Sequence, residues 1–257
     1  MATSRRDTAD SYTQRAHREG YPARSVYKLE EIQQANCIIK PGDTVLDVGA
    51  APGSWTLYTH RMLLKGKGTI ISVDLNPLNL NPVPPTVTAY VGDAFSPEIR
   101  AKLTSHGPFD AIISDAAPMT TGNRTVDTSR SEWLAEQVVF LAEEQLKQHG
   151  NLVIKIFQGG GQQKLLLEMR KMFKKAKTLK PKACRVDSFE TYLIGLDKNE
   201  KPTIKPAKRA TSVRTPPGSS ASLLLTEAPD QEARCRHPQR KPRQKNLQSS
   251  LQMHPRH

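Results

Sequence analysis

The amino-acid sequence predicts an α/β protein built on a doubly wound, seven-stranded and mostly parallel sheet with helices on both faces. Strand-like and helix-like segments alternate five times along the chain, which favours parallel strands joined by helical crossovers. An apolar, β-branched run ends at Val48, and the glycine-punctuated turn from Gly49 to Gly53 follows it. The last two expected strands leave no room for a helix between them, so we expect them to pair antiparallel.

Hydrophobic periodicity and turn residues delimit the individual elements. Strands are expected at residues 45–48, 69–73, 86–91, 110–114, 151–157 and 191–196, with a weaker one near 178–180. Helices are expected as a short segment around Tyr12 and Ala16 and at residues 26–35, 55–64, 97–105, 128–149 and 163–175. Ser25 and Ser96 are predicted N-caps, and Pro97 suits the first helical position after Ser96.

Composition divides the chain into a folded domain at residues 1–200 and a tail at residues 201–257. The tail holds 12 Lys and Arg against 3 Asp and Glu, eight of the 19 prolines, and no Phe, Trp or Tyr. It cannot bury enough apolar surface to order itself, so we expect it to be disordered. Residues 1–200 hold 26 basic against 22 acidic residues, so most of the net charge of +13 belongs to the tail. Charge alone therefore does not make the folded part an RNA binder.

The bulk properties also exclude several classes of protein. No apolar run approaches the eighteen or so residues that span a bilayer, and charged residues follow Met1 where a secretory signal would be apolar. Cys37, Cys184 and Cys235 lie far apart and form no CxxC pair. We therefore expect a cytoplasmic protein with free thiols, no zinc or other metal, and no membrane partner.

The ends of the first three strands predict a crevice for an adenosine-containing ligand. Gly49 and Gly53 let backbone approach a ligand where a Cβ would clash, although the turn lacks the GxGxxG pattern of dinucleotide-binding proteins. Asp74 ends the second strand, where a carboxylate can accept hydrogen bonds from a ribose diol. Asp93 follows the third, where it can accept from an adenine amino group. Each feature alone could be an ordinary β–α turn or turn former; their order on successive strands favours the crevice.

Two further polar residues stand at the ends of apolar strands. Asp115 follows the strand Ile112-Ile113-Ser114, and Lys155 interrupts the apolar run Leu152-Val153-Ile154-Lys155-Ile156-Phe157. Lysine is seldom buried without a partner, so Lys155 indicates either a functional site or a side chain that reaches water from the strand end.

With these residues the chain closely resembles the FtsJ (RrmJ) family of RNA ribose 2′-O-methyltransferases, of the bacterial large-subunit rRNA methyltransferase E type. The family's Lys-Asp-Lys-Glu tetrad matches Lys28, Asp115, Lys155 and Glu190. The resemblance covers about residues 5–197 and implies that residues 1–200 form a Rossmann-like methyltransferase domain that uses S-adenosyl-L-methionine. It places cofactor contacts on Gly53, Trp55, Asp74, Asp93 and Asp115, with Gly49 in the same turn. The sequence departs from the usual bacterial pattern at Ser54 and Met119.

The resemblance implies in-line methyl transfer to a ribose 2′-hydroxyl, with Lys155 as general base, Asp115 and Glu190 orienting it, and Lys28 contacting the substrate or tuning charge. A free lysine has a pKa of about 10.4 and is protonated at neutral pH. Burial and nearby cations lower a lysine pKa, whereas carboxylates raise it.

The expected substrate is a uridine in the A loop of large-subunit rRNA, free or in the 50S subunit, bound by a monomeric enzyme. Candidate RNA-binding stretches are Arg15, Arg18 and Arg24, and the nine basic residues between Lys164 and Arg185; the latter could equally be a solvated face. Three alternatives are the same chemistry on a tRNA anticodon loop, a non-catalytic ribosome assembly factor, and a nicotinamide dehydrogenase. The complete tetrad disfavours the second, and the missing GxGxxG disfavours the third.

Overall fold

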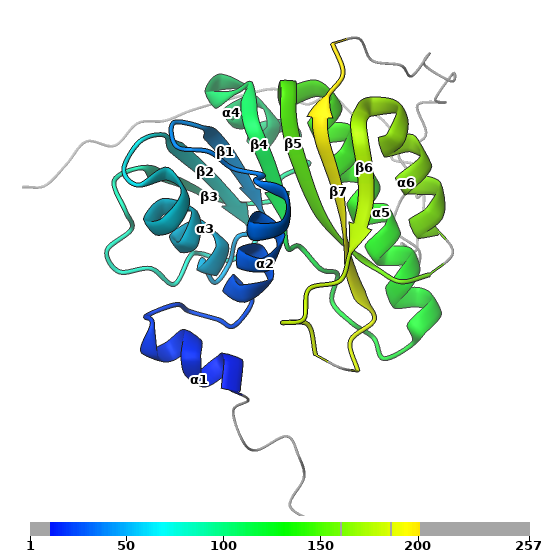
Figure 1. The fold of residues 1–257 in the computed structure, drawn as a ribbon, viewed down its shortest axis with the longest axis horizontal. Helices are drawn as coiled ribbons and strands as arrows, with labels where there is room; N and C mark the ends of the chain where they lie inside the picture. Colours follow the sequence, from blue (N-terminus) through cyan, green and yellow to red (C-terminus); the bar gives the residue numbers. More distant parts are fainter. Residues whose placement is uncertain (1–10, 160, 186, 201–257) are drawn as a thin grey trace, which may run out of the picture. The chain divides into compact units, whose positions relative to one another are not determined.

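The computed structural model describes residues 11–159, 161–185 and 187–200. The predicted basic tail, the boundary of the folded domain at residue 200, and Cys235 lie in or next to residues outside that part. Within it, helices and strands alternate and build one seven-stranded sheet (Figure 1). The strands are β1 (Thr44–Val48), β2 (Thr69–Asp74), β3 (Val87–Val91), β4 (Phe109–Ser114), β5 (Leu146–Phe157), β6 (Phe173–Leu179) and β7 (Glu190–Lys198).

The helices flank this sheet on both faces. They are α1 (Ser11–Arg18), α2 (Val26–Asn36), α3 (Ser54–Tyr58) continued by the π-helical η1 (Thr59–Leu64), α4 (Pro97–His106), α5 (Arg124–Gln145) and α6 (Gly161–Met172). Strand order is β3-β2-β1-β4-β5-β7-β6, with only β7 antiparallel to its neighbours among the described strands. The predicted doubly wound sheet and its antiparallel ending are thus confirmed.

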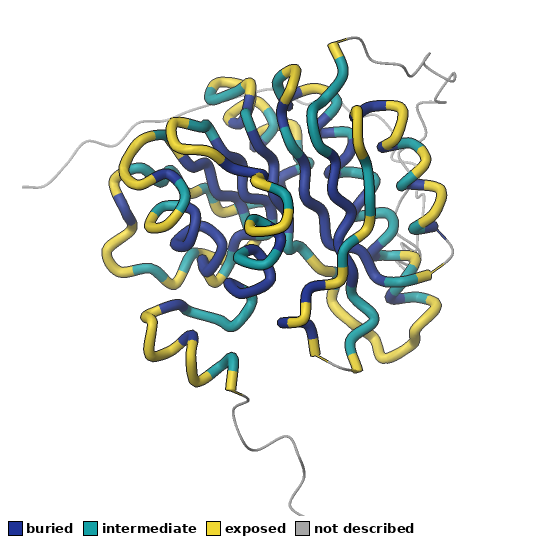
Figure 2. Tube along the Cα trace, viewed as in Figure 1, coloured by how far each residue is buried: buried dark blue, intermediate teal, exposed yellow. Residues whose placement is uncertain are grey.

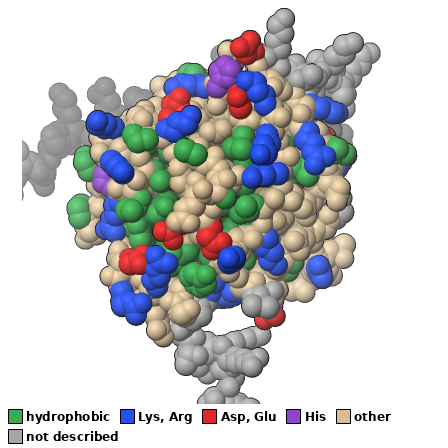
Figure 3. All heavy atoms as spheres, viewed as in Figure 1, with side chains coloured by type: hydrophobic (Ala, Val, Ile, Leu, Met, Phe, Trp, Pro, Cys, Tyr) green, Lys and Arg blue, Asp and Glu red, His purple; other side chains and the backbone are tan. Residues whose placement is uncertain are grey.

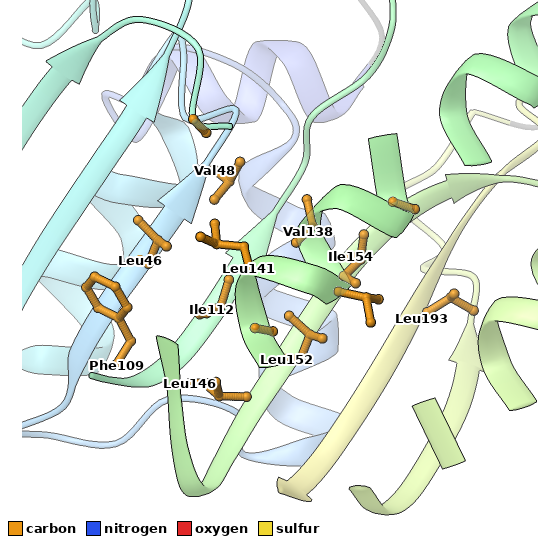
Figure 4. Packing of buried hydrophobic residues seen from close by; sticks show 14 of the residues in the cluster. Leu46, Val48, Phe109, Ile112, Val138, Leu141, Leu146, Leu152, Ile154 and Leu193 are labelled. Atoms are coloured by element: carbon orange, nitrogen blue, oxygen red, sulfur yellow. The ribbon is translucent and has the colours of Figure 1, made fainter. Parts of the chain in front are cut away.

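Alternation of side chains along the strands divides the core into two clusters. One lies against α4, α5 and α6, where Leu46, Ile112 and Ile154 meet Val138 and Leu141 of α5 (Figure 4). The other joins the opposite face of the strands to α2 and α3 and includes Trp55 and Tyr192. Figure 2 shows that the strands form the buried centre while the connecting loops are exposed. Burial on both faces is why the inner strands β1, β2 and β4 are largely apolar, whereas the outer strands β3 and β6 are partly exposed.

Most predicted boundaries are right within three residues, but both ends of the predicted helix 128–149 and the starts of the strands predicted at 151 and 178 differ by four or five. The helix predicted at 128–149 begins at Arg124, where the Asn123 side chain accepts from two backbone N–H groups, and ends at Gln145. Residues 146–149 belong to β5, where Leu146 pairs with Phe109. Likewise α6 ends at Met172 and Phe173 begins β6, with its ring against Gly195. In both places contacts with another strand override a locally helical pattern.

The two predicted N-caps have opposite outcomes. Ser96 has extended backbone angles and its hydroxyl accepts from the Ile99 N–H, which confirms that prediction. Ser25 is itself in the right-handed helical region and makes no side-chain cap, so the second prediction is wrong. Its carbonyl oxygen instead accepts a hydrogen bond from the indole Nε1 of Trp55, 2.8 Å away. The position is therefore used to join α2 to α3.

Candidate active site at the carboxyl edge of the sheet

The predicted site residues gather where the parallel strands end. Asp74 is the last residue of β2, and Asp115 directly follows β4. Lys155 lies two residues before the end of β5. Because β7 runs antiparallel, its first residue, Glu190, lies at this same edge, opposite Phe157. Ligands of doubly wound sheets bind at such an edge, next to the point where strand order reverses.

Lys155, Asp115 and Tyr192 form a closed hydrogen-bonded group. The Lys155 ammonium lies 3.0 Å from Asp115 Oδ1 and also donates to the Asp115 carbonyl oxygen. Tyr192, which is directly opposite Lys155 in the β5–β7 register, donates its hydroxyl proton to the same Oδ1 at 2.7 Å. The Lys155 side chain is only 9% exposed. The interpretation that Lys155 reaches water from a strand end is therefore wrong, because its ammonium ends on a carboxylate inside the protein.

Lys28 and Glu190 form the second pair of the site. The Lys28 Nζ lies 2.7 Å from Glu190 Oε1, with the two side chains 11% and 12% exposed. The Lys28 ammonium also lies 6.0 Å from the centre of the Tyr192 ring. The four residues that the sequence predicted from separate motifs are thus brought together around Tyr192.

Electrostatics couple the two pairs. Burial alone would raise the pKa of Asp115, but Lys155, Lys28 and the Tyr192 hydroxyl together hold that pKa below its ordinary value. Burial lowers the pKa of Lys28, while Asp115 and Glu190 raise it by more, so Lys28 stays a cation. Burial and the two carboxylates raise the pKa of Tyr192 far above 10, so it remains a hydrogen-bond donor. At neutral pH the site therefore holds a fixed carboxylate with donors aimed at it.

The N-terminal side of the site is held by contacts between α2 and the loop that connects β6 to β7. Glu31, one turn after Lys28, accepts hydrogen bonds from the backbone N–H groups of Lys182 and Ala183 at 2.7 and 2.8 Å. Arg24 donates to the Ala183 carbonyl oxygen. These bonds hold the loop before Glu190 against the helix that carries Lys28, so the pair is positioned from both sides.

The turn after β1 requires glycine at positions 49 and 53. A Cβ on Gly49 would lie 2.5 Å from that of Ala116, and its φ of +75° is a conformation that favours glycine. Gly53 has φ +111° and faces Leu80 from the segment after β2. Asp74 holds this turn, because its Oδ2 accepts from the Ala51 N–H at 3.0 Å. The carboxylate of Asp93 is exposed and accepts from the Phe95 N–H at 3.0 Å. Both acids are turn formers here as well as candidate ligand contacts.

Trp55 differs from the other predicted cofactor contacts. Its side chain is 2% exposed, its Nε1 is bonded to Ser25, and its ring lies 5.8 Å from that of Tyr192. The indole thus packs behind the site and supports Tyr192. The contact of Trp55 with a cofactor stays a prediction.

Three residues of this region were missed by sequence reasoning. Tyr192 lies two positions after Glu190, and the two-residue period of a strand could have placed it on the same face. Glu31 gave no signal, because an acid on an amphipathic helix is ordinary. Asp47 was passed over within an apolar strand; it is fully buried, and its pKa is raised to about 7, first by burial and then by Asp115 and Asp74.

The basic residues proposed to meet RNA are more dispersed than the sequence suggested. Arg15 is exposed, but it pairs with Glu19 at 2.7 Å, and its guanidinium lies 4.2 Å from the Tyr27 ring centre. Arg24 donates to the Ala183 carbonyl oxygen in the β6–β7 loop. The stretch from Lys164 to Arg185 divides among α6, β6 and the β6–β7 loop, and Lys174 is paired with Asp197. Figure 3 shows Lys and Arg side chains scattered over the visible face, with acids among them.

Other expectations concern metals, membranes and thiols. The described residues contain no group of three or more His, Cys, Asp or Glu side chains able to hold a metal ion. No helix in this same part of the chain is long and apolar enough to cross a membrane. Cys37 and Cys184 are free thiols; burial and the nearby Glu190 raise the pKa of Cys184 to about 12.

Sheet order and the site at its carboxyl edge define a Rossmann-like α/β protein with a buried Lys-Asp-Tyr group at that edge. Comparison with known proteins narrows this class. The model of the family described as FtsJ-like methyltransferase matches residues 21–198. The chain therefore belongs to the FtsJ-like methyltransferase family.

Individual relatives agree with that family. Over 197 residues the chain is 51% identical to the ribosomal RNA large subunit methyltransferase E of Treponema denticola, covering 77% of this chain and 98% of that protein. It is 44% identical over 186 residues to the protein of that name from Borrelia garinii subsp. bavariensis, covering 72% and 95%. A Plasmodium falciparum crystal structure described as a ribosomal RNA methyltransferase matches with a TM-score of 0.62 and 26% identity, over 69% of this chain and 98% of that one.

Proposed function

We propose that this protein methylates the 2′-hydroxyl of a uridine ribose in large-subunit ribosomal RNA, with S-adenosyl-L-methionine as methyl donor. The observation that carries the proposal is the buried Lys155–Asp115–Tyr192 group with the Lys28–Glu190 pair beside it. The ribosomal substrate is supported by the relatives from Treponema and Borrelia, whose names describe large-subunit rRNA methyltransferases. No contact among the described residues favours a tRNA anticodon loop over this substrate.

The residues of the crevice fit the proposed cofactor. Gly49 and Gly53 have positive φ, and Ala116 and Leu80 occupy the space that a Cβ would fill, so the turn requires glycine at both positions. Asp74 ends β2 and Asp93 follows β3 by two residues, and their carboxylate oxygens would accept from ribose hydroxyls and from an adenine amino group. When bound there, S-adenosyl-L-methionine supplies a methyl group already activated on a sulfonium, so the chemistry needs no metal. Gly49 and Asp115 would border the cofactor on the side of the tetrad.

Lys155 is the group best placed to take the proton of the attacking hydroxyl. Lys155 lies in an otherwise apolar segment of β5, and its Nζ is fixed by the Asp115 side chain and carbonyl oxygen. In the neutral form this nitrogen would accept the 2′-hydroxyl proton as the ribose oxygen attacks the methyl carbon. Tyr192 holds Asp115 in place. Glu190 fixes Lys28, whose ammonium would contact the RNA or tune the charge of the site.

Methyl transfer from a radiolabelled donor tests this function. Three substrates are compared: 50S subunits that lack the modification, naked large-subunit rRNA, and tRNA, with the labelled nucleotide then mapped. We expect label on a uridine ribose of the large-subunit RNA. Lys155→Ala should reduce the rate at least 100-fold, within the range for loss of a general base, while cofactor affinity by calorimetry changes little.

Lys147→Ala is the matched control, because Lys147 lies on the same strand and pairs with Asp110 at its opposite end. It should retain full activity. Label that maps to a base, or only to tRNA, would contradict the proposed substrate. A Lys155→Ala enzyme that keeps more than a few per cent of the rate would contradict the general-base role.

A further inference from the structure

An aromatic pair lies one step beyond the candidate catalytic residues. Phe157 follows Lys155 by two positions on the same face of β5, a spacing of about 7 Å, and stands opposite Glu190 in the sheet. The Phe189 ring packs edge-on against it, with 4.6 Å between centroids and 63° between ring planes. The Gln158 N–H donates to the Phe189 carbonyl oxygen at 2.7 Å. These contacts fix Phe189 at the carboxyl edge, beside the proposed reacting groups.

The other side of Phe189 carries a guanidinium. Arg124, the first residue of α5, places its guanidinium carbon 5.5 Å from the Phe189 ring centre. The start of α5 is fixed by the Asn123 side chain, which accepts from the Thr125 N–H, and by Asp127, which accepts from Thr121 and Gly122. Arg124 is exposed and Phe189 half-exposed. The stack Phe157–Phe189–Arg124, which we name the aromatic stack, therefore opens to solvent at its Arg124 end.

We propose that the aromatic stack binds the base of the nucleotide whose ribose is methylated; this rests on the proposed function. Unpaired bases in RNA bind by stacking on aromatic rings and on arginine planes. The ribose must reach Lys155, and the stack begins one strand step further along the same face, where an attached base would project. The Arg124 side chain is long and exposed, so it can move outward to admit the base. The base then stacks between two flat surfaces, the Arg124 guanidinium and the Phe189 ring.

This arrangement differs from a purely structural role for Phe189. A side chain needed only to close the core requires apolar volume, which leucine also supplies. A stacking platform requires a flat π-surface, which leucine lacks and tyrosine or tryptophan retains. Phe157, only 8% exposed, already closes this end of the sheet beneath Phe189. The half-exposed ring above it is the part available to a ligand.

Kinetics of Phe189→Leu, Phe189→Tyr and Phe189→Trp on 50S subunits that lack the modification test the proposal. We expect Phe189→Leu to raise KM for the subunit about 5- to 150-fold, the range for loss of one base–aromatic stack. The rate at saturating substrate, the cofactor Kd and the Tm should stay near wild type. Phe189→Tyr and Phe189→Trp should restore KM to within threefold. Met62→Ala removes an exposed apolar side chain on η1 and serves as the control.

Each outcome decides one question. A Phe189→Leu enzyme with KM within twofold of wild type would overturn the aromatic stack as a binding site, and so would equal defects in the leucine, tyrosine and tryptophan variants. Wild-type enzyme that methylates no RNA ribose would overturn the proposed function instead. The two failures are therefore distinguishable, because the first requires an active wild-type enzyme.

Discussion

Asp47 in β1 provides a sharp test of the electrostatics beneath the site. Its side chain is fully buried; Oδ2 accepts from Thr56 Oγ1 at 2.7 Å, and Oδ1 has no hydrogen-bond partner among the described residues. Burial, with help from the charges of Asp115 and Asp74, raises its pKa from 3.8 to about 7. Folding therefore favours the protonated acid. We predict that Asp47→Asn, which is neutral at every pH, gains stability relative to wild type as pH rises.

The sign and the size follow from proton linkage. Because the folded pKa lies above the unfolded value, the protonated form supports the fold fully below about pH 4, and this contribution is lost as pH rises through 7. One pKa unit corresponds to about 1.4 kcal/mol. Between pH 5 and pH 8 the free energy of unfolding of the wild-type protein should thus fall by about 2–3 kcal/mol, whereas that of the variant should not. The buried amide of the variant adds a cost of about 1–3 kcal/mol that does not change with pH.

Urea unfolding of the cofactor-free protein at pH 5 and pH 8 measures this difference. At pH 5 the variant should be less stable than wild type, and at pH 8 it should match or exceed it. Ser72→Ala is the control, since the Ser72 hydroxyl lies 3.0 Å from that of Thr56 and carries no charge. Its cost should be equal at both pH values. If the stability difference between Asp47→Asn and wild type is the same at pH 5 and at pH 8, the raised pKa of Asp47 is refuted.

Three further predictions concern binding and positioning. Glu31→Gln should weaken the hydrogen bonds to the β6–β7 loop and lower the free energy of unfolding, measured in urea, by about 1–2 kcal/mol. Because the loop that supports Glu190 is then held less firmly, the variant should lower kcat more than it raises KM. Asp74→Ala should weaken cofactor binding in calorimetry; unchanged affinity would remove Asp74 from the crevice. Deletion of residues 201–257 should raise KM for RNA and flatten its salt dependence, by about 0.7–0.9 in the log–log slope for each phosphate that the tail neutralises, and unchanged slopes would leave the tail without a role in RNA binding.

The sequence was most informative where local pattern and tertiary structure agree. The apolar strands ending at Val48, Asp74 and Ser114 were predicted almost to the residue, because burial on both faces demands unbroken apolar runs. The junctions at Leu146 and Phe173 could not be predicted in this way. Each side chain continues a helical pattern, and only its strand partner, which is distant in sequence, makes it extended.

The residues of the site also fall into those that the sequence pattern revealed and those that it did not. Asp115 and Lys155 were detectable because a charge in or next to an apolar strand requires a partner. Lys28 and Glu190 look ordinary in their own segments, and only the resemblance to the FtsJ family singled them out. The dual use of Trp55 and Ser25, joined by one hydrogen bond, had no local signal. Such contacts join residues about thirty positions apart and depend on how α2 packs against α3.

The direction of β7 explains how Lys28 and Glu190, which are far apart in the sequence, come together in one site. In a wholly parallel sheet the first residue of a strand lies at the edge opposite the ligand crevice. For β7, whose nine residues span about 26 Å, parallel pairing would place Glu190 a strand length away from the carboxyl edge. Antiparallel pairing with β5 instead brings Glu190 to the carboxyl edge and sets Tyr192 opposite Lys155. The turn that reverses the chain is held to α2 by Glu31, so the helix that supplies Lys28 also holds the loop that supplies its partner.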